Sequence, residues 1–100
     1  MSSCEDTAPY ALVVQGDSMV PEFPDGTVVI VDPAYPAAEG AFVVAEYHGD
    51  LALRQLTQQD GQRCLKALNP AYPAVVTDNT LFIHGVVVQQ NYRRKIKHYT

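Results

Sequence analysis

The sequence predicts an all-β fold, a partly open barrel of short antiparallel strands. Two observations support this prediction. Runs rich in Val, Ile, Leu and aromatic residues recur along the 100-residue chain, with Gly, Pro, Asn or Asp between them, a pattern typical of all-β domains. No segment of the sequence has apolar residues at helical spacing over three turns, which argues against a long amphipathic helix.

Six segments carry strand signals, because they are short, largely apolar or β-branched, and end at turn residues. They are residues 10–15, 27–31, 41–47, 51–56, 62–68 and 80–89. A short connection containing Gly49 predicts a hairpin between the third and fourth segments, and Asp60-Gly61 predicts another before the fifth. Gly85 lies inside the last segment, where a glycine is typical of a β-bulge.

Length and composition indicate one ordinary globular domain. A chain of 100 residues with 47% hydrophobic and 18% charged residues fits a single modest core. No apolar run approaches the roughly 20 residues that span a bilayer, and residues 1–9 lack the basic start and apolar stretch of a signal peptide. We therefore expect a cytoplasmic protein without membrane contact, with a flexible lead-in at 1–9, the domain at 10–92 and a basic tail at 93–100.

Charge is unevenly distributed along the chain. Arg93, Arg94, Lys95 and Lys97 lie in the last eight residues, whereas the other 92 residues hold three basic and eleven acidic side chains. A basic end of this kind could meet nucleic acid or the acidic body of a second subunit, or it could be a solvated, frayed terminus. The acidic body argues against direct nucleic-acid binding by this domain, since neutralising phosphates supplies most non-specific affinity.

The two cysteines, Cys4 and Cys64, are far apart in the sequence and form no Cys-x-x-Cys motif. This spacing indicates neither a metal site nor a redox motif, and we expect two free thiols. No metal and no cofactor is predicted.

Ser18 follows a predicted strand and Gly16, at the start of a loop. Gly16 can adopt backbone angles closed to other residues and lets another chain approach, and the amides of Ser18 and Met19 could point at a developing oxyanion. A serine at such a position is more often a simple turn residue. Two serine-hydrolase motifs are excluded: Val20 stands where Gly-x-Ser-x-Gly needs glycine, and Met19 stands where Gly-Asp-Ser-Leu esterases have leucine.

Several motifs in order resemble the C-terminal domains of LexA, UmuD and phage repressors, which have the LexA/signal-peptidase-like fold. The motifs are Val14-Gln15-Gly16-Asp17-Ser18-Met19, Pro21, Asp25-Gly26-Thr27-Val28-Val29-Ile30-Val31-Asp32, Gly40-Ala41-Phe42-Val43-Val44-Ala45, Leu51-Ala52-Leu53-Arg54-Gln55-Leu56, Leu68-Asn69-Pro70-Ala71-Tyr72-Pro73 and Ile83-His84-Gly85-Val86-Val87. The resemblance implies a Ser-Lys dyad that cleaves an Ala-Gly or Cys-Gly bond in the protein's own N-terminal linker. It also implies a LexA-like peptidase domain at 10–92, a homodimer built through it, and a RecA-type filament as a partner.

The resemblance assigns the site residue by residue. Ser18 matches the nucleophile, Met19 the backbone donor of the oxyanion hole, and Gly16 and Asp17 the substrate loop. Arg54 stands where the family has its general-base lysine.

Arg54 is a poor general base. Lowering a lysine pKa from about 10.4 to 7 requires about 4.6 kcal/mol, whereas an arginine, whose ordinary pKa is higher still, requires roughly 7.5–9 kcal/mol. We therefore expect autoproteolysis to be impaired. An active serine autopeptidase with another base stays open as the alternative, as does a relative of signal peptidases. The other candidate bases are His48, Lys66, His84, Lys95 and Lys97.

Two further expectations concern cleavage and pairing. The 17 residues before Ser18 contain no Ala-Gly or Cys-Gly pair and no helix-turn-helix, so we expect either a trimmed piece of a longer protein or a short standalone member. Segment 82–89 is predicted either to form a dimer through an open edge or to lie inside the sheet.

Overall fold

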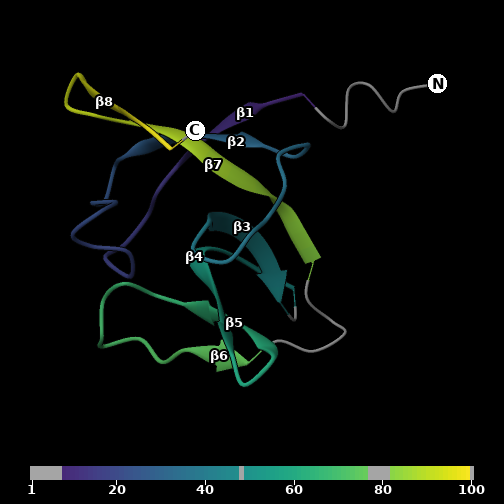
Figure 1. Ribbon diagram of the computed structural model, residues 1–100. Helices are drawn as coiled ribbons and strands as arrows, with labels where there is room; N and C mark the ends of the chain where they lie inside the picture. Colours follow the sequence, from purple (N-terminus) through teal and green to yellow (C-terminus); the bar gives the residue numbers. More distant parts are fainter. Residues whose placement is uncertain (1–7, 48, 77–81, 100) are drawn as a thin grey trace.

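The strands of the computed structural model form one curved antiparallel sheet (Figure 1). The structure describes residues 8–47, 49–76 and 82–99. The strands are β1 (Tyr10–Val13), β2 (Val28–Asp32), β3 (Phe42–Tyr47), β4 (Asp50–Gln59), β5 (Gln62–Lys66), β6 (Val75–Val76), β7 (Phe82–Tyr92) and β8 (Lys95–His98). Their order is β1-β2-β7-β3-β4-β5-β6, with β8 paired to β7. The all-β prediction is confirmed, and over the described residues the sheet stays open, with β1 and β6 at its ends.

All six predicted strands are present, with ends that differ from the prediction by a few residues. The two predicted hairpins are confirmed, since β4 pairs antiparallel with β3 and with β5. Gly85 pairs with Val44, and the β3–β7 register shifts beside this pair, so the bulge falls next to the glycine. Cys64 is a free, buried thiol, as predicted. Cys4, His48 and the expected strand residues 80–81 lie outside the described residues.

The basic C-terminal segment is the largest difference from the sequence prediction. The expectation of a frayed terminus is wrong for Lys95–His98, which form β8 and pair with Gln89–Tyr92 of β7. Arg93 and Arg94 make the turn with φ of 52° and 69°. Two consecutive positive φ angles are what a tight hairpin turn requires, but Asn-Gly or Asp-Gly usually supplies them. The sequence therefore carries no ordinary turn signal at this point.

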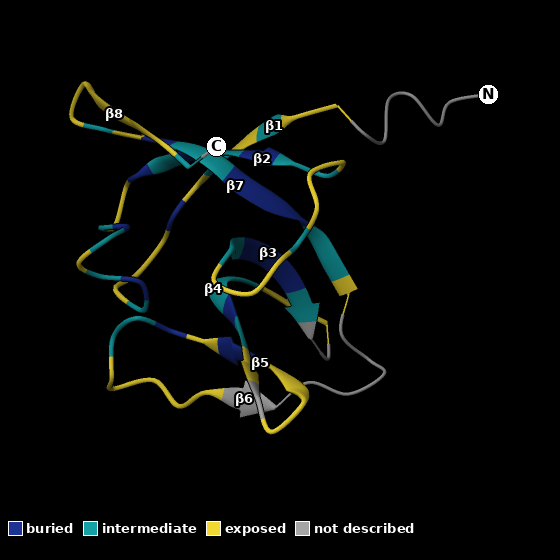
Figure 2. Ribbon diagram, viewed as in Figure 1, coloured by how far each residue is buried: buried dark blue, intermediate teal, exposed yellow. Residues whose placement is uncertain are grey.

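β7 lies inside the sheet. Residues Val86–Asn91 pair with β2 on one side, while on the other side β7 pairs first with β3 and then with β8. The hypothesis of an open edge along 82–89 is therefore wrong from Val86 onward, and the alternative of an internal strand is confirmed there. Figure 2 shows the middle parts of β7 and β3 as buried and β8 as exposed.

Two apolar cores pack on the two faces of the sheet. The larger core joins strand residues to the loop after β1 and consists of Val14, Met19, Phe23, Val29, Val31, Val44, Ala67 and Val87. The smaller core on the other face consists of Val43, Ala45, Leu56, Leu65 and Val86. Neighbouring residues of β3 alternate between the two cores, as the period of a strand requires. Among the described residues no helix has the length and apolar character needed to cross a membrane.

Gly85 is needed because two strands approach closely at this residue. A Cβ atom there would lie 2.6 Å from Val31 Cγ1 and 3.1 Å from the Asp32 carbonyl oxygen. Overpacking of this kind destabilises by about 1–3 kcal/mol, so we expect Gly85→Ala to lower the free energy of unfolding by that amount, as measured by urea denaturation. As the control, Ala11→Val adds methyl groups at an exposed position of β1 and should change stability by no more than about 0.5 kcal/mol. An unchanged midpoint for Gly85→Ala would contradict the close packing.

A polar network fastens the C-terminal hairpin to the loop that carries Phe23. The Glu22 carboxylate accepts hydrogen bonds from Lys97 Nζ at 2.5 Å and from the Tyr99 hydroxyl, and Gln90 Nε2 donates to the Tyr99 oxygen at 2.6 Å. The bond from Lys97, with that from Tyr99, lowers the pKa of Glu22 below its usual value of 4.5. Burial and the Glu22 contact raise the pKa of Tyr99.

The lowered pKa of Glu22 predicts a loss of stability in acid. A carboxyl group whose pKa is depressed by folding stabilises the fold above its unfolded pKa, and this contribution disappears as the pH falls through the folded pKa. We therefore expect Glu22→Gln to be less stable than the wild type at pH 7, and the difference to shrink below about pH 4.5. Urea denaturation of both proteins between about pH 3 and 7 checks this, and a difference that does not change with pH would refute it.

Candidate functional site

The loop after β1 carries Ser18 and is fixed by hydrogen bonds at both ends. Gly16 has a φ of 86°, a conformation that favours glycine, and its N–H donates to Asp25 Oδ1 at 2.6 Å. The Ser18 carbonyl oxygen accepts a bond of 2.9 Å from the Asn69 N–H, and Asn69 Nδ2 donates to the Asp17 carbonyl oxygen at 3.0 Å. These contacts hold the Ser18 side chain at a defined position, half-exposed at the surface.

Met19 anchors the loop to the larger core. Its side chain is fully buried, and its carbonyl oxygen accepts a bond of 2.9 Å from the Phe23 N–H. The Met19 amide donates to no oxygen of the described residues. Within the described chain this N–H, which belongs to the residue after Ser18, is therefore left without a protein acceptor.

Arg54 is brought directly against Ser18. Its Nη1 donates hydrogen bonds to Ser18 Oγ at 3.0 Å and to the Leu53 carbonyl oxygen at 2.8 Å. The guanidinium is half-buried, and burial lowers the pKa of Arg54, an effect that Tyr72 partly opposes. The two positions that sequence reasoning assigned to one site, 18 and 54, therefore lie in contact.

Tyr72 is a site residue whose role sequence reasoning missed. Its hydroxyl donates to Asp17 Oδ1 at 2.7 Å, and this bond raises the pKa of Tyr72. The Arg54 Cζ atom lies 6.0 Å from the centre of the Tyr72 ring, a distance at which a cation–π attraction operates. The motif around Pro70 was recognised in the sequence, but nothing in it indicated a contact with Asp17.

A pocket of about 470 Å³ opens beside Ser18. Two walls come from strands that are distant in sequence, residues 12–15 around the end of β1 and residues 51–54 of β4. Ser18, Arg54 and Tyr72 lie at its polar end. Val13 and Leu51 on its walls are 59% and 55% exposed, so apolar side chains are available to a ligand.

Both pocket walls present free strand edges. The Val14 N–H and carbonyl bond to the β2 side, at Thr27 and Gly26. Because backbone groups alternate in direction along a strand, those of Val13 point away from β2. The Leu56 N–H bonds to Ala41 at the start of β3, so by the same alternation Leu51 and Leu53 point their backbone groups away from β3. β4 pairs with β5 only from Gln55 onward, so within the described chain these groups have no backbone partner. The Leu53 carbonyl oxygen accepts only the side-chain bond from Arg54 Nη1.

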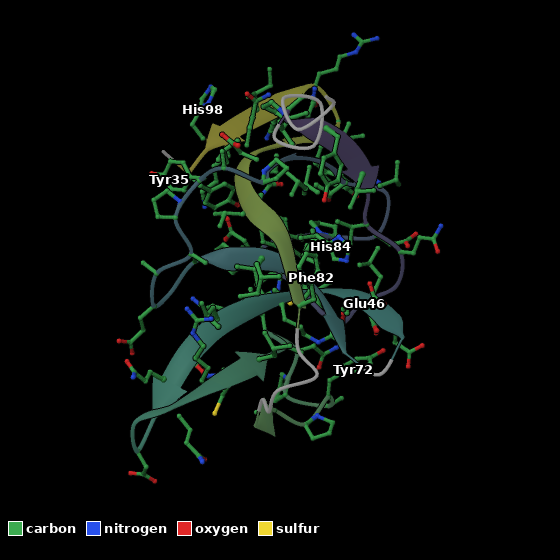
Figure 3. The ribbon with its side chains drawn as sticks, turned by 90° about the vertical axis from the view of Figure 1, so that its right-hand side faces the viewer. Tyr35, Glu46, Tyr72, Phe82, His84 and His98 are labelled. Atoms are coloured by element: carbon green, nitrogen blue, oxygen red, sulfur yellow. The ribbon has the colours of Figure 1, made fainter. Side chains whose placement is uncertain are left out.

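The alternative bases lie elsewhere. His84 Nε2 lies 2.9 Å from Glu46 Oε1, and its ring stacks edge-on against Phe82, a group seen together in Figure 3. Lys97 binds Glu22. Lys95 belongs to β8. Lys66 pairs with Gln55, the neighbour of Arg54, so its side chain leaves the sheet on the opposite face. Of the described residues, Arg54 alone bonds the Ser18 hydroxyl through its side chain.

Comparison with known families identifies the family of the chain. Residues 2–88 match the family described as Peptidase S24-like. The chain belongs to this family. The Peptidase S24-like assignment agrees with the resemblance inferred from the sequence motifs, and it includes Ser18 and Arg54 within the matched residues.

The S24-like chain is similar to several repressors and regulators. The HTH-type transcriptional regulator for conjugative element SXT of Vibrio cholerae is 39% identical over 87 residues, which cover 80% of this chain and 40% of the regulator. Prophage repressor CohE of Escherichia coli (strain K12) is 37% identical over 92 residues, 88% of this chain and 41% of the repressor. LexA repressor 2 of Pseudomonas syringae pv. tomato is 40% identical over 80 residues, 77% of this chain and 40% of the repressor. The chain thus spans about two fifths of the length of these curated relatives.

Proposed function

We propose that this chain is the LexA-like C-terminal domain of a phage-type repressor or SOS-response regulator, in which the inherited serine is no longer activated. The names of the relatives support the regulatory assignment, since they are repressors and transcriptional regulators. The domain would act in the cytoplasm through subunit association. Direct contact with DNA would belong to another part of such a protein.

The observation that carries the proposal is the hydrogen bond from Arg54 Nη1 to Ser18 Oγ at 3.0 Å. A guanidinium donates hydrogen bonds and has no acceptor lone pair, so it cannot take the serine proton. Burial lowers the pKa of Arg54, but neutral arginine at pH 7 would cost roughly 7.5–9 kcal/mol. The proton therefore stays on Ser18, and the contact holds the hydroxyl without activating it.

The ancestral substrate of such a site is an extended segment of the protein's own linker. Backbone groups on the free edges of β1 and β4 would pair with it as an added strand, and the apolar walls would hold its side chains. The amide of Met19 would stabilise the oxyanion. In this proposal the binding geometry is retained and the step that removes the serine proton is lost.

Self-cleavage of an extended chain tests the proposal. A segment containing an Ala-Gly bond is fused upstream of Met1, and the protein is incubated alone at pH 7 and at alkaline pH, with cleavage followed by intact mass. We expect no cleavage at either pH. Cleavage that is abolished by Ser18→Ala would refute the proposal and favour an active peptidase with another base.

We also infer that the domain associates as a homodimer, with a RecA-type filament as a further partner of the whole protein. The basic hairpin around Arg94 and Lys95 and the acidic remainder of the chain are complementary in charge, so two copies would attract each other electrostatically. Sedimentation velocity at micromolar protein should give a dimer that weakens at high salt. A monomer at all salt concentrations would contradict this inference.

A further inference from the structure

Among the described residues, the guanidinium of Arg54 makes no ion pair with a carboxylate. The ion pairs of the described residues join His84 to Glu46 and Lys97 to Glu22, and neither involves Arg54. Of the described residues that line the pocket, Asp17 is the one acidic residue, and its Oδ1 accepts the hydrogen bond of Tyr72 rather than one from the guanidinium. A half-buried cation beside apolar walls is costly unless it is paired, so the pocket favours an anionic ligand.

The unused donors of Arg54 specify what kind of anion fits. Nη1 donates its two hydrogens to Ser18 Oγ and to the Leu53 carbonyl oxygen. Within the described chain Nε and Nη2 have no acceptor. Two parallel N–H groups on one side of a guanidinium match the two oxygens of a carboxylate. The Nε–H and Nη2–H groups of Arg54 are therefore available to a ligand at the polar end of the pocket.

The rest of the pocket specifies what carries the carboxylate. The backbone groups of Val13 and Leu51 and the N–H of Leu53 have no backbone partner within the described chain and can pair with an extended peptide. The exposed Val13 and Leu51 side chains offer it apolar contacts. The backbone hydrogen bonds of an added strand give affinity that does not depend on the peptide sequence. Contacts with the peptide side chains add a preference for particular residues. An internal peptide bond at Ser18 would bring only a neutral carbonyl to the guanidinium and leave the charge unpaired.

We propose that this pocket binds the free C-terminal carboxylate of an extended apolar peptide, with Arg54 as the residue that recognises the carboxylate. The replacement of lysine by arginine then changes a site for an internal bond into a site for a chain end. The proposal rests on the proposed function in one respect, namely that Arg54 stays protonated. It goes beyond the proposed function because it names a ligand that the site binds without cleaving it.

The test compares peptides that differ only at the C-terminus. A fluorescein-labelled hexapeptide, Ser-Lys-Thr-Val-Val-Ala, is prepared as the free acid and as the amide, and its binding is measured by fluorescence anisotropy. The wild type should bind the acid about tenfold or more tightly than the amide, as expected for a charge-assisted pair. Arg54→Gln should bind both forms equally. Arg94→Gln, the same change in the exposed β7–β8 turn, should keep the full preference.

Each other outcome overturns the proposal. Equal binding of acid and amide by the wild type, no binding at about 1 mM, or an acid preference that survives in Arg54→Gln excludes recognition by the guanidinium. A third peptide, an amide with Glu in place of the last Ala, must bind more weakly than the acid, since equal binding would assign the site to acidic side chains. Circular dichroism verifies that Arg54→Gln is folded. Labelling of wild-type Ser18 by a fluorophosphonate reports separately on serine activation, so failure of the proposed function is distinguishable from failure of peptide binding.

Discussion

Arg54→Lys should make Ser18 react with a fluorophosphonate at least about a hundredfold faster than in the wild type, the range of a positioned general base. A lysine amine can lose its proton, and the burial that lowers the pKa of Arg54 would lower the pKa of a lysine at the same position. Reaching neutrality at pH 7 would require about 4.6 kcal/mol, which burial can provide. The shorter lysine also releases Ser18 Oγ from a donor that cannot accept its proton.

The pH dependence identifies the base. Because the amine must be neutral, the labelling rate of Arg54→Lys should rise with pH through the lysine pKa and then level off. Intact mass spectrometry after timed labelling measures the rate. Arg54→Gln should show no gain, and the double variant with Ser18→Ala should show no labelling. An unchanged rate in Arg54→Lys would leave the assignment of position 54 as the base without support.

Phe23→Ala should lower the free energy of unfolding by about 3–5 kcal/mol, the cost of removing a large buried ring. Phe23 is fully buried. Its ring meets that of Phe42 edge-on at 4.9 Å between centroids and that of Tyr99 at 5.6 Å. The substitution therefore removes the centre of an aromatic cluster that joins the Ser18 loop, β3 and the C-terminal residues.

Phe82→Ala provides the matched control in a urea denaturation series. Phe82 is 60% exposed, so losing its ring should change stability by no more than about 0.5 kcal/mol. A loss below about 1 kcal/mol for Phe23→Ala would mean that the cluster is not part of the cooperative core.

The sequence predicted the strands well because strand signals are local. Segments such as 41–47 and 62–68 have β-branched or apolar residues bounded by Gly or Asn, and both form strands within a few residues of the prediction. β8 was missed because its turn uses Arg93 and Arg94 at positive φ, which no rule of turn composition favours. The double pairing of β7 was left open because strand order depends on long-range contacts that local signals do not contain.

The candidate site could be predicted only in part, because local motifs do not contain long-range contacts. Ser18 and Arg54 were assigned together through family motifs, and they lie in contact. The contribution of Tyr72 could not be predicted, because its bond to Asp17 spans 55 positions of the chain and depends on how the loop after β5 folds back. The free edges of the pocket likewise follow from pairing partners and not from the identities of Leu51 or Leu53.

The alternation of backbone direction along the two pocket walls has a consequence for hydrogen exchange. The amides of Ala11, Val13, Leu51 and Leu53 point away from their partner strands by the alternation already described, whereas those of Leu12, Val14 and Ala52 are bonded. Amides without an acceptor exchange with solvent deuterium quickly. In the free domain these odd-numbered amides should therefore exchange before their even-numbered neighbours. A peptide that adds as a strand should slow the odd positions alone, so that an occupied pocket leaves an alternating pattern of protection along both walls.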